Sequence, residues 1–249
     1  MIQNPFSLEN KRVLVTGASS GIGRAIAIEC SKIGATMVIT GRNPERLKDT
    51  FSQLEGLNHS LFVADLQIED QVNLLVENSP LLDGVVHSAG VINTSPFQYI
   101  TKEKLNEIFS INFFLPALLS KNLIKQKKIK NGASIVWISS IAGSLCASYG
   151  RSMYSAAKSA VNGMVKGMAL DLSSKGIRVN SVNPAVIDTN VVSESFITQE
   201  QWQEEIKKYP LKRYGKPQEV AYATIYLLSD ASAWVTGSHL IIDGGFTLL

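Results

Sequence analysis

Short apolar runs alternate with helix-forming segments along this chain, and the alternation limits the folds open to it. Seven runs are rich in β-branched and apolar residues, as buried strands are: Arg12–Thr16, Thr36–Thr40, Leu61–Ala64, Gly84–His87, Ser134–Ile138, Arg178–Val182 and His239–Ile242. The segments between them predict helices over residues 22–33, 44–54, 69–77, 102–123, 154–173, 198–208 and 217–228. This alternation predicts an α/β fold, a doubly wound parallel sheet of about seven strands with helices on both faces.

The composition is that of one globular unit. Hydrophobic residues make up 45% of the 249 residues and charged residues 18%, which excludes a mainly disordered chain. No linker and no shift in composition divides the sequence, and α/β chains of this length commonly form one core. We therefore expect a single domain over residues 1–249.

A glycine-rich segment joins the first predicted strand to the first predicted helix. It reads TGASSGIG from Thr16 to Gly23. Glycine lets the backbone approach a pyrophosphate, and the start of the helix directs free N–H groups and a positive dipole toward it. The βαβ context favours phosphate binding over a plain turn and predicts a Rossmann-type nucleotide site. The predicted contacts are Gly17, Ser19, Ser20, Gly21, Ile22 and Gly23.

The ends of the second and third predicted strands bear on the choice of nucleotide. The second ends in Gly41 and Arg42, where a carboxylate would bind a ribose 2′-hydroxyl and an arginine accommodates a 2′-phosphate. Arg42 therefore favours NADP(H) over NAD(H), although a surface arginine at a helix start is the alternative. The third strand is followed by Asp65 and Leu66, both predicted to contact the nucleotide; Asp65 either binds adenine or caps the next helix.

Tyr154 and Lys158 lie four positions apart in a predicted helix, after a segment rich in glycine and serine. Residues at this spacing share one helix face. An ammonium beside a phenol favours the phenolate, so we expect Lys158 to lower the pKa of Tyr154 and make it a proton donor and acceptor. Taken alone, the pair is more typical of an ordinary amphipathic helix, with Tyr154 packed and Lys158 solvated.

Charge and targeting features favour a soluble, cytoplasmic protein that binds neither nucleic acid nor membrane. The net charge is +3, and the densest basic run, residues 125–130, resembles a solvated helix end because no aromatic residues interleave it. Neither a signal peptide nor a long apolar span is evident. Cys30 and Cys146 suggest free thiols, and the three scattered histidines suggest no metal site.

The glycine segment and the YSAAK motif together resemble the short-chain dehydrogenase/reductase family. The resemblance extends from about Lys11 to Phe246 and is strongest to the branch that contains the 3-oxoacyl-(acyl carrier protein) reductases. It implies an NAD(P)-dependent oxidoreductase with a Rossmann-type fold.

The resemblance also implies the catalytic residues. Tyr154 matches the general acid/base of the family, and Lys158 matches the lysine that holds the nicotinamide ribose and lowers the tyrosine pKa. Ser140 matches the serine that orients the substrate, with Ser139 as the weaker candidate. Asn112 matches the asparagine that holds a water in the proton relay.

Further cofactor contacts follow from the same resemblance. The sequence from His87 to Gly90 stands where the family has NNAG; Ala89 and Gly90 still match positions that line the adenosine ribose. Both asparagines are missing, which puts the stabilisation of this strand end in question. Ile187 and Thr189 match residues that meet the carboxamide.

Three further features of the sequence concern the expected substrate pocket, and two of them depart from the family pattern. Ala185 replaces a glycine in the loop after the sixth strand and would be strained if its φ were positive. Ser140 and Tyr154 are 14 positions apart, one more than is typical of the reductase branch, and Tyr149 between them lacks a lysine four residues on. By resemblance, residues 191–212 form a lid over the substrate.

The expected function is reduction of a carbonyl to an alcohol with NADP(H), on a small-molecule substrate that is free or bound to a carrier. The resemblance of the C-terminal segment implies a homotetramer, with a homodimer as the alternative. Two other functions stay open: a sugar, alcohol or steroid-like dehydrogenase using NAD(P), and a non-catalytic protein that senses NADP(H).

Overall fold

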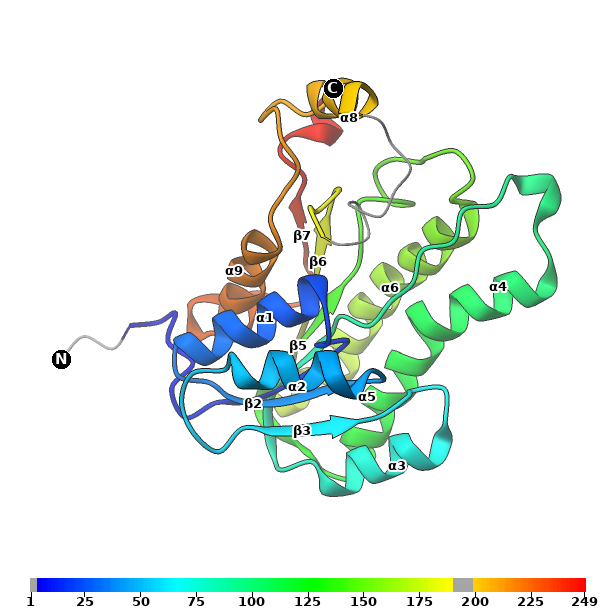
Figure 1. The fold of residues 1–249 in the computed structure, drawn as a ribbon. Coiled ribbons are helices and arrows are strands. Elements are labelled where there is room, and N and C mark those ends of the chain that lie inside the picture. Colours follow the sequence, from blue (N-terminus) through cyan, green and yellow to red (C-terminus); the bar gives the residue numbers. More distant parts are fainter. Residues whose placement is uncertain (1–3, 190–198) are drawn as a thin grey trace.

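One parallel sheet of seven strands runs through the molecule, in the order β3-β2-β1-β4-β5-β6-β7 (Figure 1). The computed structural model describes residues 4–189 and 199–249, with residues 199–202 described by their backbone alone. The strands are β1 (Arg12–Thr16), β2 (Thr36–Gly41), β3 (Ser60–Val63), β4 (Leu82–His87), β5 (Ile129–Ile138), β6 (Arg178–Pro184) and β7 (His239–Ile242). The α/β fold predicted from the alternation is confirmed.

The strand order reverses between β1 and β4, which are neighbours in the sheet but not in the sequence. Thr16 at the end of β1 pairs with His87 at the end of β4. The connections leaving these two strands turn to opposite faces of the sheet, so a crevice opens at their carboxyl ends. This is the place where doubly wound sheets bind ligands.

Helices cover both faces of the sheet (Figure 1). They are α1 (Gly21–Lys32), α2 (Pro44–Ser52), α3 (Glu69–Asn78), α4 (Lys102–Phe109), α5 (Leu115–Lys125), α6 (Ser152–Asp171), α8 (Gln199–Lys207) and α9 (Pro217–Leu228). In β1, Val13 and Val15 pack with α1, α2 and α9, whereas Leu14 packs with α3, α5 and α6. Alternate side chains of a buried strand face opposite layers, which is why these strands are apolar throughout.

The single helix predicted over residues 102–123 is wrong in one respect. A π-helical turn, η2 (Ser110–Phe114), separates α4 from α5. A π turn keeps the apolar character of the surrounding helix and adds one residue to a turn, so hydrophobic periodicity does not reveal it. Strand β5 also begins earlier than predicted, at Ile129, where it pairs with Leu82 before a shift in register.

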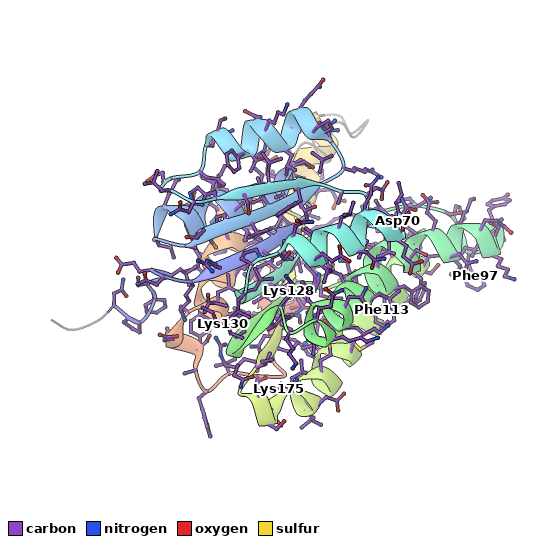
Figure 2. All side chains as sticks on the ribbon, turned by 90° about the horizontal axis from the view of Figure 1, so that it is seen from below. Asp70, Phe97, Phe113, Lys128, Lys130 and Lys175 are labelled. Carbon is purple, nitrogen blue, oxygen red and sulfur yellow. The ribbon has the colours of Figure 1, made fainter. Side chains whose placement is uncertain are left out.

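The basic run of residues 125–130 does not form a simple helix end. Lys128 donates hydrogen bonds to the carbonyls of Glu77 and Ser79 at the end of α3, and Lys130 pairs with Asp83 at 2.7 Å. Both lysines are labelled in Figure 2. Cations suit the carbonyl end of a helix. Lys125 and Lys127 are exposed at the end of α5 as predicted, whereas Lys128 and Lys130 join this segment to α3 and β4.

The predicted lid is described in part. Residues 190–198 lie outside the described part, and of the rest α8 covers Gln199–Lys207. Within the described ranges, no helix has both the length and the apolar character needed to cross a bilayer.

Candidate active site

A cavity of about 1760 Å³ lies at the carboxyl edge of the sheet. At one end it is lined by Arg42 and Asp65, beyond β2 and β3, and at the other by Ser140, Tyr154 and Lys158. The glycine segment lies along its floor. Every residue predicted from the sequence as a cofactor contact or catalytic residue lines this one cavity: Gly17, Ser19, Ser20, Gly21, Ile22, Gly23, Arg42, Asp65, Leu66, Ala89, Gly90, Asn112, Ser140, Tyr154, Lys158, Ile187 and Thr189.

The glycine segment is shaped by close backbone contacts. Gly17 has a φ of +68°, and a Cβ on it would lie 2.8 Å from the backbone of Ala89. A Cβ on Gly23 would lie 2.3 Å from the carbonyl oxygen of Gly17. Glycine at these two positions lets α1 pack against the loop and lets the loop meet the end of β4. Thr16 fixes the same junction, because its hydroxyl accepts the N–H groups of Ser88 and Ala89 at 3.2 and 3.3 Å.

The start of α1 is suited to an anion. Ser20 at the N-cap makes no side-chain capping bond, and the first turn holds no acidic residue. The first N–H groups of a helix lack intrahelical partners, and the helix dipole makes this end positive. These features fit the pyrophosphate of a dinucleotide.

Arg24 was missed by the sequence reasoning. Its guanidinium donates to the carbonyl of Ser19 at 3.0 Å and pairs with Asp49 of α2 at 2.9 Å. It therefore holds the glycine segment against α2. Its place directly after the last glycine was the one available signal, and basic residues at such positions are common on solvated helices.

Arg42 and Asp65 stand where the sequence predicts the adenosine end. Arg42 is exposed and follows β2 directly. Asp65 does not cap α3, whose N-cap is Ile68; its carboxylate accepts the N–H of Gln67 at 3.0 Å instead. The capping alternative for Asp65 is therefore wrong, and the carboxylate stays at the cavity.

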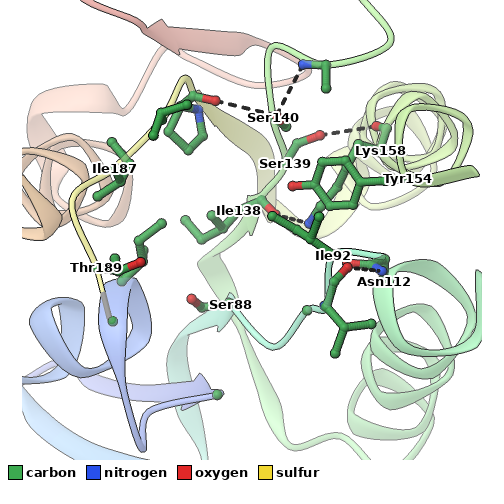
Figure 3. A pocket seen from close by; sticks show the side chains of 18 of the residues that line it. Ser88, Ile92, Asn112, Ile138, Ser139, Ser140, Tyr154, Lys158, Ile187 and Thr189 are labelled. Atoms are coloured by element: carbon green, nitrogen blue, oxygen red, sulfur yellow. Dashed lines mark hydrogen bonds between the residues drawn. The ribbon is translucent and has the colours of Figure 1, made fainter. Parts of the chain in front are cut away.

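Tyr154 and Lys158 face the cavity from α6, and each is less than a tenth exposed. Lys158 Nζ lies 5.7 Å from the centre of the Tyr154 ring and donates to the carbonyl of Ile138 at 2.8 Å (Figure 3). Burial lowers the pKa of Lys158 to about 8. The two residues share one helix face as predicted.

The expected effect on the tyrosine is wrong for this structure. Burial raises the pKa of Tyr154, and a hydrogen bond with Ser140 and the positive charge of Arg151 oppose that rise. The free-energy cost of removing the phenolate from water is larger than the stabilisation of the phenolate by Ser140 and Arg151. Tyr154 is therefore a neutral phenol at physiological pH.

The two serines at the end of β5 have different roles. The Ser140 hydroxyl accepts the N–H of Ala142 at 3.1 Å and donates to the Pro184 carbonyl at 3.5 Å, and its interaction with Tyr154 opposes the rise in the pKa of that phenol. The Ser139 hydroxyl donates to the backbone carbonyl of Lys158 at 3.1 Å, which joins β5 to α6 (Figure 3). Ser140 is thus the serine placed beside the phenol, and Ser139 holds the helix that carries it.

Asn112 lies in the π turn and is buried. Its amide donates to the carbonyls of Val91 and Ile108 at 2.9 and 3.0 Å, and its oxygen accepts the N–H of Val91 at 3.3 Å. A Cβ on Gly90 would lie 2.8 Å from that oxygen. Asn112 therefore fixes the loop after β4 beside Lys158, and its oxygen retains one lone pair for a further donor.

His87 stabilises the end of β4, where the two asparagines of the family motif are missing. Its Nε2 lies 2.6 Å from the hydroxyl of Ser120 in α5, and its ring lies 4.5 Å from that of Trp137. Burial lowers the pKa of His87 to about 3, so the ring is neutral. The end of β4 is therefore attached to α5 through a histidine.

Ile187 and Thr189 lie across the cavity from Tyr154 (Figure 3). The loop that carries them is not strained at Ala185. This residue is not one of the described non-glycine residues with a positive φ. Its N–H donates to the carbonyl of Ile242 at 2.9 Å, in continuation of the pairing of β6 with β7. The possible cost of alanine at this position is therefore not incurred.

Tyr149 and Arg151, in the loop before α6, also line the cavity. The Tyr149 side chain is fully exposed, in keeping with its rejection as the acid. Arg151 was missed by the sequence reasoning, because a single arginine in a Gly/Ser-rich loop carries no periodic signal. In the described part of the chain, no group of three or more His, Cys, Asp or Glu could hold a metal ion.

Comparison with known proteins decides the family. A family model described as enoyl-(acyl carrier protein) reductase matches residues 17–247. The 3-oxoacyl-[acyl-carrier-protein] reductase of Rickettsia prowazekii is 31% identical over 244 residues, which cover 98% of this chain and 100% of the relative. The chain is a short-chain dehydrogenase/reductase.

Other members of the family are similar as well. L-xylulose reductase of Caenorhabditis elegans is 32% identical over 249 residues, covering 97% of this chain and 98% of the relative. A candidate NAD(P)-dependent gluconate 5-dehydrogenase from Beutenbergia cavernae, solved with NADP at low occupancy, superposes with a TM-score of 0.88 at 27% identity and covers 99% of this chain and 100% of its own. As a short-chain dehydrogenase/reductase, this protein is an NAD(P)-dependent oxidoreductase acting on CH–OH or C=O groups.

Proposed function

We propose that this protein reduces a carbonyl group to an alcohol with NADPH, and that Tyr154 is the general acid. The observation that carries the proposal is the place of the Tyr154 hydroxyl, which lines the cavity together with Ser140 and Lys158, while burial raises the pKa of Tyr154. A phenol that is protonated at physiological pH is ready to donate. Reduction requires donation, whereas oxidation requires the phenolate.

The residues along the cavity fit a dinucleotide. The start of α1 and residues 17–23 would hold the pyrophosphate, Asp65 and Leu66 the adenine, and Ala89 and Gly90 the adjacent ribose. Lys158 would bind the second ribose, and Ile187 and Thr189 the carboxamide. When bound, the cofactor supplies the hydride. Arg42, exposed beyond β2 with no acidic residue beside it in sequence, supports NADP(H) over NAD(H).

The proton that the substrate receives would be transferred through side chains of this protein. Ser140 orients the carbonyl oxygen toward the Tyr154 hydroxyl, which donates its proton as the oxygen gains electrons. Lys158, with a pKa of about 8, is mostly protonated at neutral pH and can return a proton to the phenolate. The remaining lone pair of Asn112 would hold a water that links Lys158 to solvent.

We infer that the substrate enters beneath a lid over residues 191–212. Support comes from Gln203, Lys208 and Tyr209, which line the cavity beside the loop of Tyr149. The likeness to 3-oxoacyl-[acyl-carrier-protein] reductases favours a 3-oxoacyl substrate, free or carrier-bound. The likenesses to L-xylulose reductase and to a candidate gluconate 5-dehydrogenase favour a sugar or sugar acid as the second candidate.

A non-catalytic sensor of NADP(H) is the remaining alternative. Such a protein has no use for the acid or the lysine, and here Asn112, Ser140, Tyr154 and Lys158 all line one cavity. We therefore favour an enzyme, working as a single domain and assembling as a homotetramer or a homodimer.

Replacing Tyr154 with Phe tests the proposed acid. We expect kcat for carbonyl reduction to fall by roughly 10²–10⁴, while NADPH binding, followed by fluorescence titration, changes little. Tyr149→Phe is the matched control, because Tyr149 is exposed in the same region, and it should keep wild-type turnover. Initial rates with NADPH and NADH in the wild type test the cofactor. Retained turnover in Tyr154→Phe would remove the proposed mechanism.

A further inference from the structure

Arg151 presents a cation to the cavity close to the reacting end. It is the N-cap residue of α6, three positions before Tyr154 and so one helical turn away. Its side chain is half-buried and lines the cavity. The guanidinium makes no hydrogen bond and no ion pair with any residue that the structure describes, and the proposed function gives it no task.

The backbone that carries Arg151 is fixed on both sides. The Gly150 carbonyl accepts the N–H of Ser95 at 2.8 Å, and the Arg151 N–H donates to Ser148 at 3.2 Å. The Arg151 carbonyl accepts the N–H of Ser155 at 2.8 Å. Gly150 has a φ of +70°, and a Cβ there would lie 2.8 Å from the Thr94 side chain, so the loop fits tightly against residues 94–95. The guanidinium therefore extends from a rigid support, which lowers the entropy cost of binding a ligand.

The other charged groups of the cavity are either engaged or distant. Lys158 donates to the Ile138 carbonyl. Lys208 pairs with Glu205, and Glu204 pairs with Lys207. Arg42 and Asp65 lie at the opposite end of the cavity, beyond β2 and β3. Near Tyr154, neither Lys158 nor Arg151 has an acidic partner among the described residues, and of the two only the Arg151 side chain also lacks a hydrogen bond to them.

A half-buried guanidinium without an acidic partner is suited to an anion that arrives with a ligand. Arginine binds carboxylates in a bidentate manner, and such charge-assisted bonds are stronger than neutral ones. The first turn of α6 holds no acidic residue, and its dipole adds to the positive potential at this place. We propose that Arg151 binds a carboxylate of the substrate, so that the substrate of this site is an oxo acid.

This assignment rests on the proposed carbonyl reduction and narrows its substrate. An acyl thioester is neutral next to its 3-oxo group and would leave Arg151 unpaired, whereas an oxo acid would neutralise it. Neutralising Arg151 also removes a charge that favours the phenolate of Tyr154. The carboxylate would therefore help to keep the phenol protonated for the donation it has to make.

Binding to the enzyme saturated with NADP⁺ tests the proposal without turnover. Pyruvate, acetoacetate and levulinate differ in the spacing of carbonyl and carboxylate, and each has a neutral methyl ester of nearly the same shape. By calorimetry we expect at least one acid to bind roughly tenfold to a hundredfold more tightly than its ester. Arg151→Gln should abolish that preference, and Arg151→Lys should keep part of it.

Lys166→Gln is the matched control. Lys166 is exposed on α6, does not line the cavity, and its replacement removes the same charge from the same helix. It should keep the wild-type preference for acid over ester. Rates of NADPH oxidation with the same pairs, in all four proteins, should follow the same order in kcat/KM.

The outcomes separate the two proposals. Esters that bind as tightly as acids to the wild type, or acids that bind equally well to Arg151→Gln, overturn the role of Arg151 whatever the rates. Arg151-dependent binding of an acid with no turnover of any carbonyl leaves the anion site standing and overturns the reductase. Arg151-dependent binding together with turnover supports both.

Discussion

Lys158 keeps a positive charge in a buried position. It is 5% exposed, its partner is a backbone carbonyl, and no carboxylate among the described residues balances it. Burial lowers its pKa from 10.5 to about 8, which means that the folded protein holds this proton less firmly than the unfolded chain. At neutral pH the charge is therefore a cost to folding, and the proposed proton relay gives a reason for bearing it.

Replacing Lys158 with Met should make the folded protein more stable at pH 7. The methionine fills a similar volume and carries no charge to desolvate, so we expect the free energy of unfolding to rise by on the order of 1–3 kcal/mol. Between pH 8 and 10.5 the unfolded wild type binds more protons, so the wild type recovers stability as the pH rises. The difference between the two proteins should therefore shrink toward pH 10.

Urea unfolding of both proteins from pH 7 to pH 10 measures this difference. Lys166→Met on the exposed face of the same helix is the control and should change stability little at any pH. A Lys158→Met protein that is less stable than the wild type at pH 7 would show that the bond to Ile138 outweighs the buried charge.

At the scale of elements, the π turn between α4 and α5 sets the direction in which the Asn112 side chain points, and an unbroken α-helix would direct this side chain to another face. One extra residue per turn shifts the facing of every side chain that follows. Through this shift Asn112 reaches both Ile108 within the helix and Val91 after β4. The π turn thus connects α4 to the loop after β4, which lies beside Lys158.

Asn112→Ala should loosen that junction. The buried carbonyl of Ile108 and the half-buried carbonyl and N–H of Val91 lose their partner, so we expect a loss of about 1–3 kcal/mol in the free energy of unfolding. The loop at Gly90 and Val91 would shift, and kcat should fall by roughly one to two orders of magnitude. Urea unfolding and steady-state rates measure both effects. Asn106→Ala, exposed in α4, should alter neither; equal losses in the two variants would refute a specific role for Asn112.

Elements with clear end signals could be predicted from the sequence. Helix α9 begins at Pro217, which suits the first turn of a helix, and its predicted bounds match the structure. The bounds of β1 and β7 match as well. The π turn could not be predicted, because a change in hydrogen bonding from i−4 to i−5 leaves residue types unaltered. The early start of β5 was missed because Lys130 and Asn131 are polar and contribute little to a strand pattern.

Site residues were predictable where a motif fixes them, and less so where the environment does. The glycine segment and the pair of Tyr154 and Lys158 stand in motifs with fixed spacing, and the fold brings them to one cavity. The direction in which the pKa of Tyr154 is shifted depends on burial, and the spacing of residues in the sequence gives no information about burial. Arg151 depends on which of its neighbours carry a negative charge, and that is known only once the loop is folded.

At the scale of the whole molecule, large apolar side chains are exposed in two separate regions. One runs from the tip that carries Phe97 (Figure 2) along α4 and the start of α5: Phe97, Tyr99, Leu105, Phe114 and Leu118. The other lies at the edge strand β7 and the segments beside it: Trp234, Ile241 and Leu248. Exposed apolar regions of this kind and open sheet edges commonly serve as interfaces. A closed tetramer needs more than one interface, whereas a dimer needs one.

The proposed homotetramer can therefore be divided by mutation. Leu118→Asp on α5 places a charge in the first region, and Trp234→Asp places one in the second. Sedimentation equilibrium should give four times 27.1 kDa for the wild type and twice that mass for each single variant, because burying an unpaired carboxylate at an interface is costly. The double variant should be a monomer. Leu57→Asp, on an exposed leucine of the turn between α2 and β3, should remain a tetramer. A wild type of 27.1 kDa, or a Leu118→Asp protein that stays tetrameric, would contradict this assembly.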